Sequence, residues 1–552
     1  MRKTIYLIAL AGLTQLAWHS PADAGVECEN LQAKTDSVGI TISESAKTSP
    51  TNDIPVGHCL VRGIVGARKG TDGVSYGIRF ELRLPDQWNG RYVHQFNGGN
   101  DGTVVPAVGP LLGGNKQDTA LARGYAVVSS DAGHDGKANP DRGLAAGAAF
   151  GFDPEARRDY GYGAVAKLNP IAVNLVETYY GKKIAFSYGV GGSNGGRHGL
   201  MAATRMPNDF DGILAGYPGF NLPRAALQHA LDIQSWAKVN SDISKALSRE
   251  DMATLAKGIL AACDASDGLT DGIVGDPDSC ETLFKPQALQ CPNGRTDDCL
   301  SEAQVTALLA SRAGPRGPKD EQLYSAWAWD PGMASANWRG WKLESAVDSW
   351  GRRPTIGVMG AASLAQIFTT PPTSVGGTPE ELQKFLLEFD IKSESSKIFA
   401  KDGVMTESAV EFMIPPRSDN PDLKDFREAG HKMIVFDGNA DPVFSVLDTV
   451  NWYQKLDANN KGAAQSFVKF YRIPGMPHGA GGPSYDDFDF FSPLVDWVEK
   501  GTAPQAVSAG ITQKNGEAKA LVGVRYLYCP YPQVSRVKPA LQARKREPAS
   551  KA

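Results

Sequence analysis

The stretch YGVGGSNGGRHGL, residues 188–200, places one serine inside a dense run of glycines. The apolar, β-prone run KKIAFSYGV before it predicts a buried strand, and GLMAATRM after it predicts a helix. Ser193 therefore lies at a strand-to-helix corner, and the segment 191–195 fits the G-x-S-x-G pattern of a nucleophile elbow. The alternative is a glycine-rich turn that packs or binds phosphate, although the Gly-Lys-Ser/Thr of a P-loop is missing.

Strand-like and helical patterns alternate along the chain around this corner. Apolar runs occur between residues 55 and 220 and return at 432–441 and 467–478. This alternation predicts an α/β fold with a largely parallel sheet that helices cover on both faces. Residues 221–425 hold helical patterns, clustered tryptophans and most of the cysteines, and they predict an inserted lid.

A nucleophile elbow requires an acid and then a histidine later in the chain, each on a loop after a strand. The segment FDGNADPVFS offers Asp437 and Asp441, and Asp441 is preferred because it lies further beyond the strand end. The segment RIPGMPHGAGG offers His478 among small residues. His198 follows Ser193 too closely, more than one turn into the predicted helix, where packing is the favoured role.

These residue types suit nucleophilic catalysis on an ester. A serine hydroxyl is a weak nucleophile, so His478 would accept its proton while Asp441 orients the imidazole. Two backbone N–H groups would stabilise the oxyanion: that of Asn194, and one from the QFNGGNDG turn at Gly98 or Gly99. A plain turn is the alternative for these two glycines.

The N-terminus has the features of a secretory signal peptide over residues 1–24. Arg2 and Lys3 precede the apolar run TIYLIALAGLTQLAW, and Ala22-Asp23-Ala24 offers a cleavage site. The apolar run is shorter than a membrane span requires, so we expect an exported protein without a membrane anchor. Whether it stays in the periplasm or leaves the cell is not indicated.

Export permits disulfides, and the chain has seven cysteines: Cys28, Cys59, Cys263, Cys280, Cys291, Cys299 and Cys529. Connectivity cannot be deduced from sequence, but short loops favour pairing in sequence order, with Cys529 left over. No C-x-x-C pair supports zinc. The net charge of −4 gives no electrostatic footprint for nucleic acid, and the basic tail 538–552 is interpreted as a solvated terminus.

Longer motifs extend along the chain, including LRLPDQWNGRYVHQFNGG, GGSNGGRHG, DGILAGYPGFNLP, CDASDGLTDGIV, FDGNADPVFS, PGMPHGAGGP and LYCPYPQ. Together they resemble the tannase and feruloyl esterase family of α/β-hydrolases, from about Cys28 to Pro532. The resemblance implies an α/β-hydrolase fold with a catalytic core over 25–220 and 426–552 and a large inserted lid over 221–425.

The resemblance also implies roles for individual residues. Ser193, Asp441 and His478 fall on the family's catalytic triad, and Gly99 with Asn194 falls on its oxyanion hole. The pairs Cys28–Cys59, Cys263–Cys280 and Cys291–Cys299 fall on family disulfides. Trp341 and Phe444 fall on aromatic pocket positions, which favours a ring-bearing acyl group; ordinary core packing is the alternative.

One departure from the family lies beside the triad. The family usually joins cysteines next to the serine and the histidine by a disulfide, and here Gly192 and Gly479 stand at these positions. Because both cysteines are missing together, this is interpreted as a coherent variant whose triad is looser or differently supported.

The segment CDASDGLTDGIVGDPDSC raises the question of a metal site. Asp264, Asp267 and Asp271 bring together hard oxygen ligands of the kind that Ca²⁺ prefers, but two Asp-Gly turns explain the pattern as well. The resemblance implies a structural calcium ion on these residues and on the backbone carbonyls of Leu269 and Ile273. No organic cofactor is expected.

The sequence therefore predicts a secreted serine carboxylesterase whose substrates are small-molecule esters of aromatic acids: hydroxycinnamic, gallic or related benzoic acids. The alternatives are a serine hydrolase for another ester, a lactone or a polyester fragment, and a non-catalytic secreted binding protein on the same scaffold. The sequence does not indicate the oligomeric state.

Overall fold

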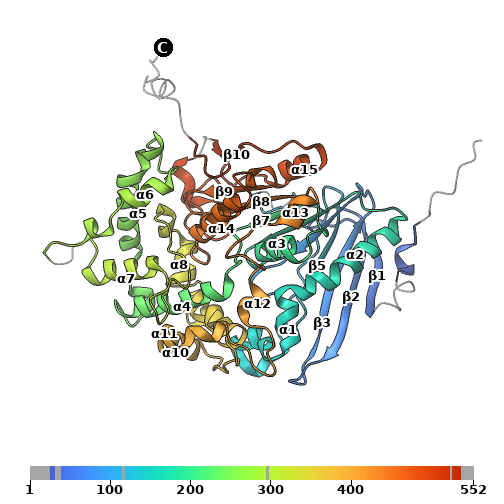
Figure 1. Ribbon diagram of the computed structural model, residues 1–552, viewed down its shortest axis with the longest axis horizontal. Helices are drawn as coiled ribbons and strands as arrows, with labels where there is room; N and C mark the ends of the chain where they lie inside the picture. Colours follow the sequence, from blue (N-terminus) through green and yellow to red (C-terminus); the bar gives the residue numbers. More distant parts are fainter. Residues whose placement is uncertain (1–24, 32–38, 115–117, 294–297, 522–524, 536–552) are drawn as a thin grey trace, which may run out of the picture.

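A nine-stranded mixed sheet forms the centre of the molecule (Figure 1). The computed structural model describes residues 25–31, 39–114, 118–293, 298–521 and 525–535. The signal peptide expected at 1–24 and the basic tail 538–552 lie outside the described residues. Across the sheet the strand order is β1-β2-β3-β5-β4-β6-β7-β8-β9.

The N-terminal part of the sheet is antiparallel, which the sequence analysis did not predict. Strand β1 pairs with β2, β2 with β3, and β3 with β5, all antiparallel. Short loops join β1 to β2 and β2 to β3, so these connections have no room for the crossover helix that a parallel pair requires. The strands are β1 (Ile40–Thr48), β2 (His58–Lys69), β3 (Ser75–Pro85), β4 (Arg91–Phe96) and β5 (Ala126–Ser130).

The rest of the sheet is parallel, as predicted, and its strand ends carry the site. It runs from β5 through β4 to β6 (Phe186–Gly192), β7 (Gly212–Gly216), β8 (Lys432–Gly438) and β9 (Val468–Ile473). These strands are buried on both faces, so successive side chains enter two different cores. In β8, for example, Met433 and Val435 join one core, and Ile434 and Phe436 join the other.

Helices cover both faces of the sheet. One core contains side chains of α2 (Ala164–Tyr180), α3 (Asn194–Arg205) and α14 (Val446–Asn459). The opposite core contains Phe491, Leu494 and Trp497 of α15 (Phe491–Lys500). The short helix α1 (Pro154–Arg158) precedes α2.

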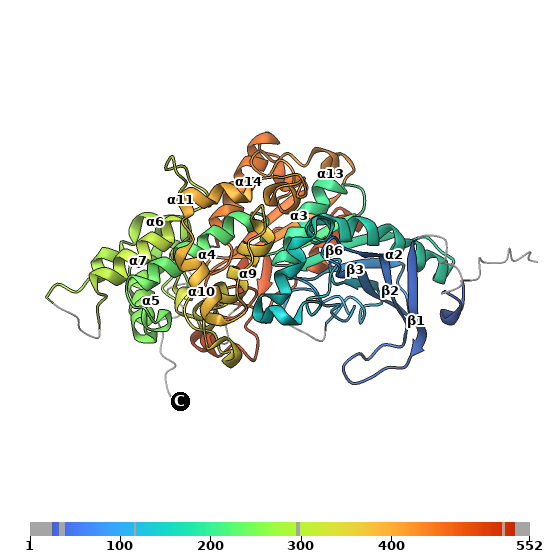
Figure 2. The same ribbon diagram turned by 90° about the horizontal axis from the view of Figure 1, so that it is seen from below.

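Most of the helices between β7 and β8 lie beside the sheet, on the side opposite β1, whereas the last of them, α13 (Lys424–Glu428), lies next to α3 (Figures 1 and 2). Among the described residues of 221–425, none belongs to either sheet. This arrangement of a mixed sheet, helices on both faces and one large insertion is an α/β-hydrolase fold with an extra helical domain. The helices of this segment are α4 (Leu222–Ala237), α5 (Arg249–Cys263), α6 (Pro277–Leu283), α7 (Glu302–Ala313), α8 (Ala336–Lys342), α9 (Ala361–Ser363), α10 (Pro379–Glu388), α11 (Ile391–Glu394), α12 (Ala409–Met413) and α13 (Lys424–Glu428).

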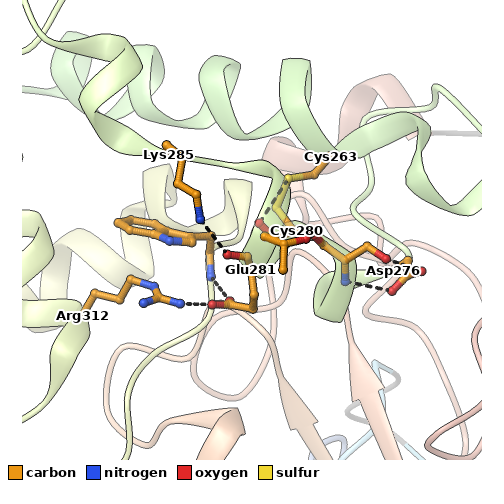
Figure 3. Close-up of a disulfide and its surroundings, with 9 residues drawn as sticks. Cys263, Asp276, Cys280, Glu281, Lys285 and Arg312 are labelled. Carbon is orange, nitrogen blue, oxygen red and sulfur yellow. Dashed lines mark hydrogen bonds and ion pairs between the residues drawn. A yellow bond between two sulfur atoms is a disulfide. The ribbon is translucent and has the colours of Figure 1, made fainter.

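Three disulfides, Cys28–Cys59, Cys263–Cys280 and Cys291–Cys299, have the pairing expected from sequence order, and Cys529 is free. Cys263–Cys280 joins α5 to α6 (Figure 3). Beside it, Glu281 forms an ion pair with Arg312 of α7, so α6 is attached to two neighbouring helices.

The C-terminal segment forms a second, two-stranded sheet. Strand β10 (Val507–Ala509) pairs antiparallel with β11 (Tyr526–Tyr528). No helix in the described ranges combines the length and the apolar character that a membrane crossing needs.

Candidate active site

Ser193 lies in the sharp turn between β6 and α3. Its backbone has φ 63° and ψ −126°, a strained conformation for a residue with a side chain. The first turn of α3 also packs tightly on the sheet. A Cβ atom at Gly195 would lie 2.3 Å from the carbonyl oxygen of Phe96, and one at Gly196 would lie 2.5 Å from that of Gly216. Glycine at these positions therefore permits the turn that exposes the serine.

The structure brings Ser193, His478 and Asp441 together from three segments of the chain. His478 follows β9, and its Nε2 lies 2.9 Å from Ser193 Oγ. Its Nδ1 lies 2.7 Å from Oδ2 of Asp441, which follows β8. The other oxygen of Asp441 accepts hydrogen bonds from the amides of Val443 at 2.7 Å and Phe444 at 3.0 Å. These two hydrogen bonds therefore hold the Asp441 carboxylate in position independently of its contact with the imidazole.

Asp437, the alternative acid in this loop, forms its hydrogen bond with α14 and not with His478. It is fully buried, and its Oδ2 accepts a hydrogen bond of 2.8 Å from Thr449 of α14. Burial raises the pKa of Asp437 well above its usual range, and the neighbouring charge of Asp441 raises it further. Both effects favour the neutral form of Asp437, and its hydrogen bond is with Thr449 and not with His478.

His198, the alternative histidine, is buried in α3. Its ring nitrogens lie 3.1 and 3.2 Å from the guanidinium of Arg197. Burial lowers the pKa of His198 well below its usual range, and the charge of Arg197 lowers it further. These contacts hold His198 in a packing position, within the helix.

Two backbone amides are available beside the serine. Gly98 and Gly99 follow β4, and a Cβ atom at Gly98 would lie 3.7 Å from Cβ of Ser193. Gly99 has φ 63°, and Tyr160 donates a hydrogen bond of 3.0 Å to its carbonyl oxygen. Within the described part of the chain, the N–H groups of Gly99 and Asn194 have no hydrogen-bond acceptor. Both are free to donate to a ligand.

The side chain of Asn194 is held by two residues that the sequence analysis missed. Its amide nitrogen donates to Asp101 at 2.8 Å, and its oxygen accepts from Arg197 at 2.6 Å. Arg197 is fully buried and also donates to the carbonyl oxygens of Tyr160 and Gly161. Burial lowers the pKa of Arg197 to about 10, which keeps it charged at neutral pH. Only its spacing of three residues from Asn194 on a helix could have indicated this contact.

Three aromatic rings surround the imidazole of His478, each in an edge-to-face arrangement. The ring centroids lie 4.9 Å away for Tyr217, 5.3 Å for Trp341 and 5.5 Å for Phe444. Trp341 comes from α8 of the insertion, and Phe444 follows Asp441. Phe444 packs with Ala225, Tyr324 and Val443, and Leu222, Trp327 and Trp341 adjoin this cluster. The sequence analysis named Trp341 and Phe444 but missed Tyr217.

The acidic segment lies far along the insertion, after α5. Asp264 accepts hydrogen bonds from the amides of Asp271 at 3.1 Å and Gly272 at 3.1 Å. The amides of Leu269 and Ile273 donate to Asp267 and Asp271. Asp267 Oδ2 is buried without a hydrogen-bond partner among the described residues. In these same residues, no group of three or more His, Cys, Asp or Glu side chains is arranged around one metal position.

Comparisons with known proteins give a consistent result. Residues 62–544 match the model of a family described as tannase and feruloyl esterase. A mono(2-hydroxyethyl) terephthalate hydrolase from Piscinibacter sakaiensis is 38% identical over 505 residues, covering 87% of this chain and 82% of that protein.

Solved structures agree in fold. Feruloyl esterase B from Aspergillus oryzae gives a TM-score of 0.73 at 22% identity, over 93% of this chain and 97% of that one. A tannin acyl hydrolase from Aspergillus niger gives a TM-score of 0.63 at 19% identity, over 92% of each chain.

Proposed function

The chain belongs to the tannase and feruloyl esterase family and is a carboxylic ester hydrolase, and we propose that it cleaves esters of aromatic acids through an acyl-enzyme on Ser193. The observation that carries this proposal is the position of His478, which lies within hydrogen-bond distance of both Ser193 and Asp441. Both distances fall in the range that a nucleophile, its base and the group that orients the base require.

Each residue of the triad has one task in the reaction. As Ser193 Oγ attacks the ester carbonyl, its proton passes to His478 Nε2, and the carbonyl electrons move onto the oxygen. The C–O bond to the alcohol then breaks, and His478 returns the proton to the leaving oxygen. Water attacks the acyl-enzyme in the same way and releases the acid. Asp441 keeps the N–H of the imidazole on Nδ1 and stabilises the cation formed at each step.

The free N–H groups of Gly99 and Asn194 stabilise the oxyanion. Asn194 is the first residue of α3, so its N–H also lies at the positive end of the helix dipole. Asn194 donates a hydrogen bond to Asp101 and accepts one from Arg197, and these two bonds fix this helix end against the Gly99 turn. Donors that are fixed before the reaction are the kind that contribute most to the rate.

Trp341 and Phe444, called the aromatic wall below, favour a substrate with a ring-bearing acyl group. Trp341 and Phe444 place two rings beside His478, and a flat acyl ring packs well on such a surface. The family description names feruloyl esters, and the relative at 38% identity is named for a terephthalate ester; both have aromatic acyl groups.

We also propose that the protein is exported from the cytosol. Three disulfides support an oxidising compartment, since cytosolic thiols are kept reduced. The signal-like residues 1–24 agree with this location.

A structural calcium ion in the segment 263–274 is the remaining part of the proposal. Asp264, Asp267 and Asp271, with the carbonyls of Leu269 and Ile273, would hold it. The buried Oδ2 of Asp267 supports this, because it lacks a hydrogen-bond partner among the described residues. Burial raises the pKa of Asp267, and the like charges of Asp271 and Asp264 raise it further; a cation would relieve this repulsion.

A panel of esters tests the proposed function. Wild-type protein and Ser193→Ala are compared on methyl ferulate, methyl gallate, methyl benzoate, a terephthalate monoester and p-nitrophenyl acetate. We expect hydrolysis of the aromatic acyl esters, abolished by the substitution. Trp341→Ala should lower kcat/KM on aromatic esters about tenfold relative to the acetate, the order expected for lost packing.

Other results on this panel favour the alternatives. Activity on the acetate alone would keep the triad and remove the aromatic acyl group, and lactones and polyester fragments would be tested next. No activity on any ester would favour a non-catalytic binding protein.

A further inference from the structure

Tyr217 lies at the carboxyl end of β7, between the turn that carries Ser193 and the loop that carries His478. We propose that its ring is a positioning element that holds the His478 imidazole in line with Ser193. This inference rests on the proposed function and adds a residue outside the triad and the oxyanion hole.

The backbone around Tyr217 is attached to both neighbouring strand ends. Ser193 N–H donates to the carbonyl oxygen of Gly216 at 3.0 Å, and Gly219 N–H donates to that of Ser193 at 3.1 Å. The N–H of Tyr217 donates to Phe436 of β8 at 2.5 Å. Tyr217 itself has φ 33°, which is rare for a residue with a side chain. The strained residue is therefore fixed from two sides.

The ring of Tyr217 occupies the space beside Gly192. A Cβ atom at Gly192 would lie 2.3 Å from the Tyr217 hydroxyl oxygen and 2.4 Å from Cζ. A Cβ atom at Gly479 would lie 3.7 Å from these same two atoms. The residue before the serine and the residue after the histidine thus face one phenol ring. A side chain at position 192 would displace that ring.

The same ring limits how the imidazole can turn. Tyr217 and His478 have centroids 4.9 Å apart and an interplanar angle of 73°, and the Tyr217 ring also packs on Phe436 of the sheet. Hydrogen bonds at Nδ1 and Nε2 hold the imidazole at two points, but the bond to Ser193 must break and re-form in each cycle. A rigid ring on one side restricts rotation during that interval.

The hydroxyl group is a neutral donor. Burial raises the pKa of Tyr217 to about 12, with a contribution from the charge of Asp441. No hydrogen bond joins this hydroxyl to the protein in the described residues. The ring, not the hydroxyl, therefore makes the contacts that position His478.

A double-mutant cycle tests this inference through the clash at position 192. The variants are Tyr217→Ala, Gly192→Ala and the two combined, with Tyr217→Phe as the conservative variant and Tyr179→Ala in α2 as a control tyrosine. Activity is measured on p-nitrophenyl acetate, whose small acyl group does not depend on the aromatic wall.

We expect Tyr217→Ala to lower kcat about 10- to 100-fold with KM within about threefold, the size of effect that misplaced catalytic groups produce. Tyr217→Phe should restore most of the rate. Gly192→Ala should lower kcat about as much as Tyr217→Ala does. The double variant should have the same kcat as Tyr217→Ala alone, because without the Tyr217 ring the alanine methyl group at position 192 has no atom to clash with. The apparent pKa in the kcat/KM profile should shift in Tyr217→Ala, which a purely structural effect would not produce.

Several results would overturn the inference. These are an unchanged kcat and pH profile in Tyr217→Ala, a harmless Gly192→Ala, or losses that simply multiply in the double variant. Thermal melting separates misfolding from these outcomes, and Tyr217→Leu replaces the alanine variant if that one does not fold. An inactive wild-type protein, or an active Ser193→Ala, would instead contradict the proposed function.

Discussion

His478 is the residue on which the site depends, and the structure shows what restrains it. Its two nitrogens contact Ser193 and Asp441, its carbonyl oxygen accepts a hydrogen bond of 3.0 Å from Asn337, and three aromatic rings surround it. Its side chain is 10% exposed, so a substrate can still reach it. The imidazole of His478 is therefore held in position and still accessible to a substrate.

The two acids of the FDGNAD loop should respond differently to the same substitution. Asp441→Asn removes the charge that stabilises the imidazolium and should lower kcat about 10⁴-fold, as in other serine triads. Burial raises the pKa of Asp437 and favours its neutral form, so Asp437→Asn should keep kcat within about threefold. Steady-state kinetics of both variants on p-nitrophenyl acetate measure the difference. Equal losses would mean that Asp437 also acts on the imidazole.

The sequence predicted the residues whose position follows from chain order. Ser193, Asp441 and His478 each follow a parallel strand, and strand order brings such loops together. Asp101 and Tyr217 were not predicted, because their contacts depend on packing between segments with no local pattern. Arg197 was not predicted either, although it lies three residues after Asn194 on the same helix. In the sequence, Tyr217 is a tyrosine in an ordinary turn. Only the structure shows that Gly192 and Gly479 face its ring.

At the scale of elements, the parallel strands were predictable and the antiparallel edge was not. Strand β8 contains the continuous apolar run MIVF, which is typical of strands buried on both faces. The edge strand β1 has a largely polar sequence and alternates buried and exposed residues only at its start, so its strand pattern is weak. The helices of the insertion begin at clear signals, such as the capping boxes at Ser248, Ser301 and Thr378.

The acidic loop after α5 gives a prediction about metal removal. If calcium binds there, adding EGTA to the wild-type protein should lower its melting temperature by several degrees, since a ligand of the folded state stabilises it. Asp267→Asn should melt at a lower temperature and lose its response to EGTA. Calorimetry with and without added Ca²⁺ measures both. A wild-type melting temperature insensitive to EGTA and Ca²⁺ would support the Asp-Gly turns instead.

In the whole molecule, the insertion is connected to the catalytic loop through Asp330. Its two carboxylate oxygens accept hydrogen bonds from Gly332 at 2.7 Å and from Gly475, three residues before His478, at 3.0 Å. Asp330 is fully buried between the two parts. The insertion therefore supports the loop that carries His478.

Removing this link should affect both stability and rate. Asp330→Ala leaves two buried amides without an acceptor, at a cost of about 1–3 kcal/mol each in the free energy of unfolding. We expect kcat to fall about tenfold as the His478 loop loosens, the order expected for displaced catalytic groups. Asp330→Asn keeps one acceptor and should lose less. Urea unfolding and kinetics together check this, and a stable, fully active Asp330→Ala would refute it.

The same residue makes stability depend on pH. Burial raises the pKa of Asp330 to about 6, above its value of about 4 in an unfolded chain. The folded state thus holds this proton more tightly, so the proton-linked part of the stability is present below about pH 4 and is lost as the pH rises through about 6. The stability difference between wild type and Asp330→Asn should therefore change over this range. A constant difference from pH 4 to 7 would contradict the shifted pKa.

The role of Ser193 as the nucleophile is tested by covalent labelling of the folded protein with a p-nitrophenyl phosphonate, followed by peptide mass spectrometry. We expect one phosphonyl group per chain, located on Ser193, with loss of ester hydrolysis in proportion to labelling and no reaction of Ser193→Ala. Labelling at another serine, or full labelling that leaves hydrolysis intact, would contradict the assignment of Ser193 as the nucleophile.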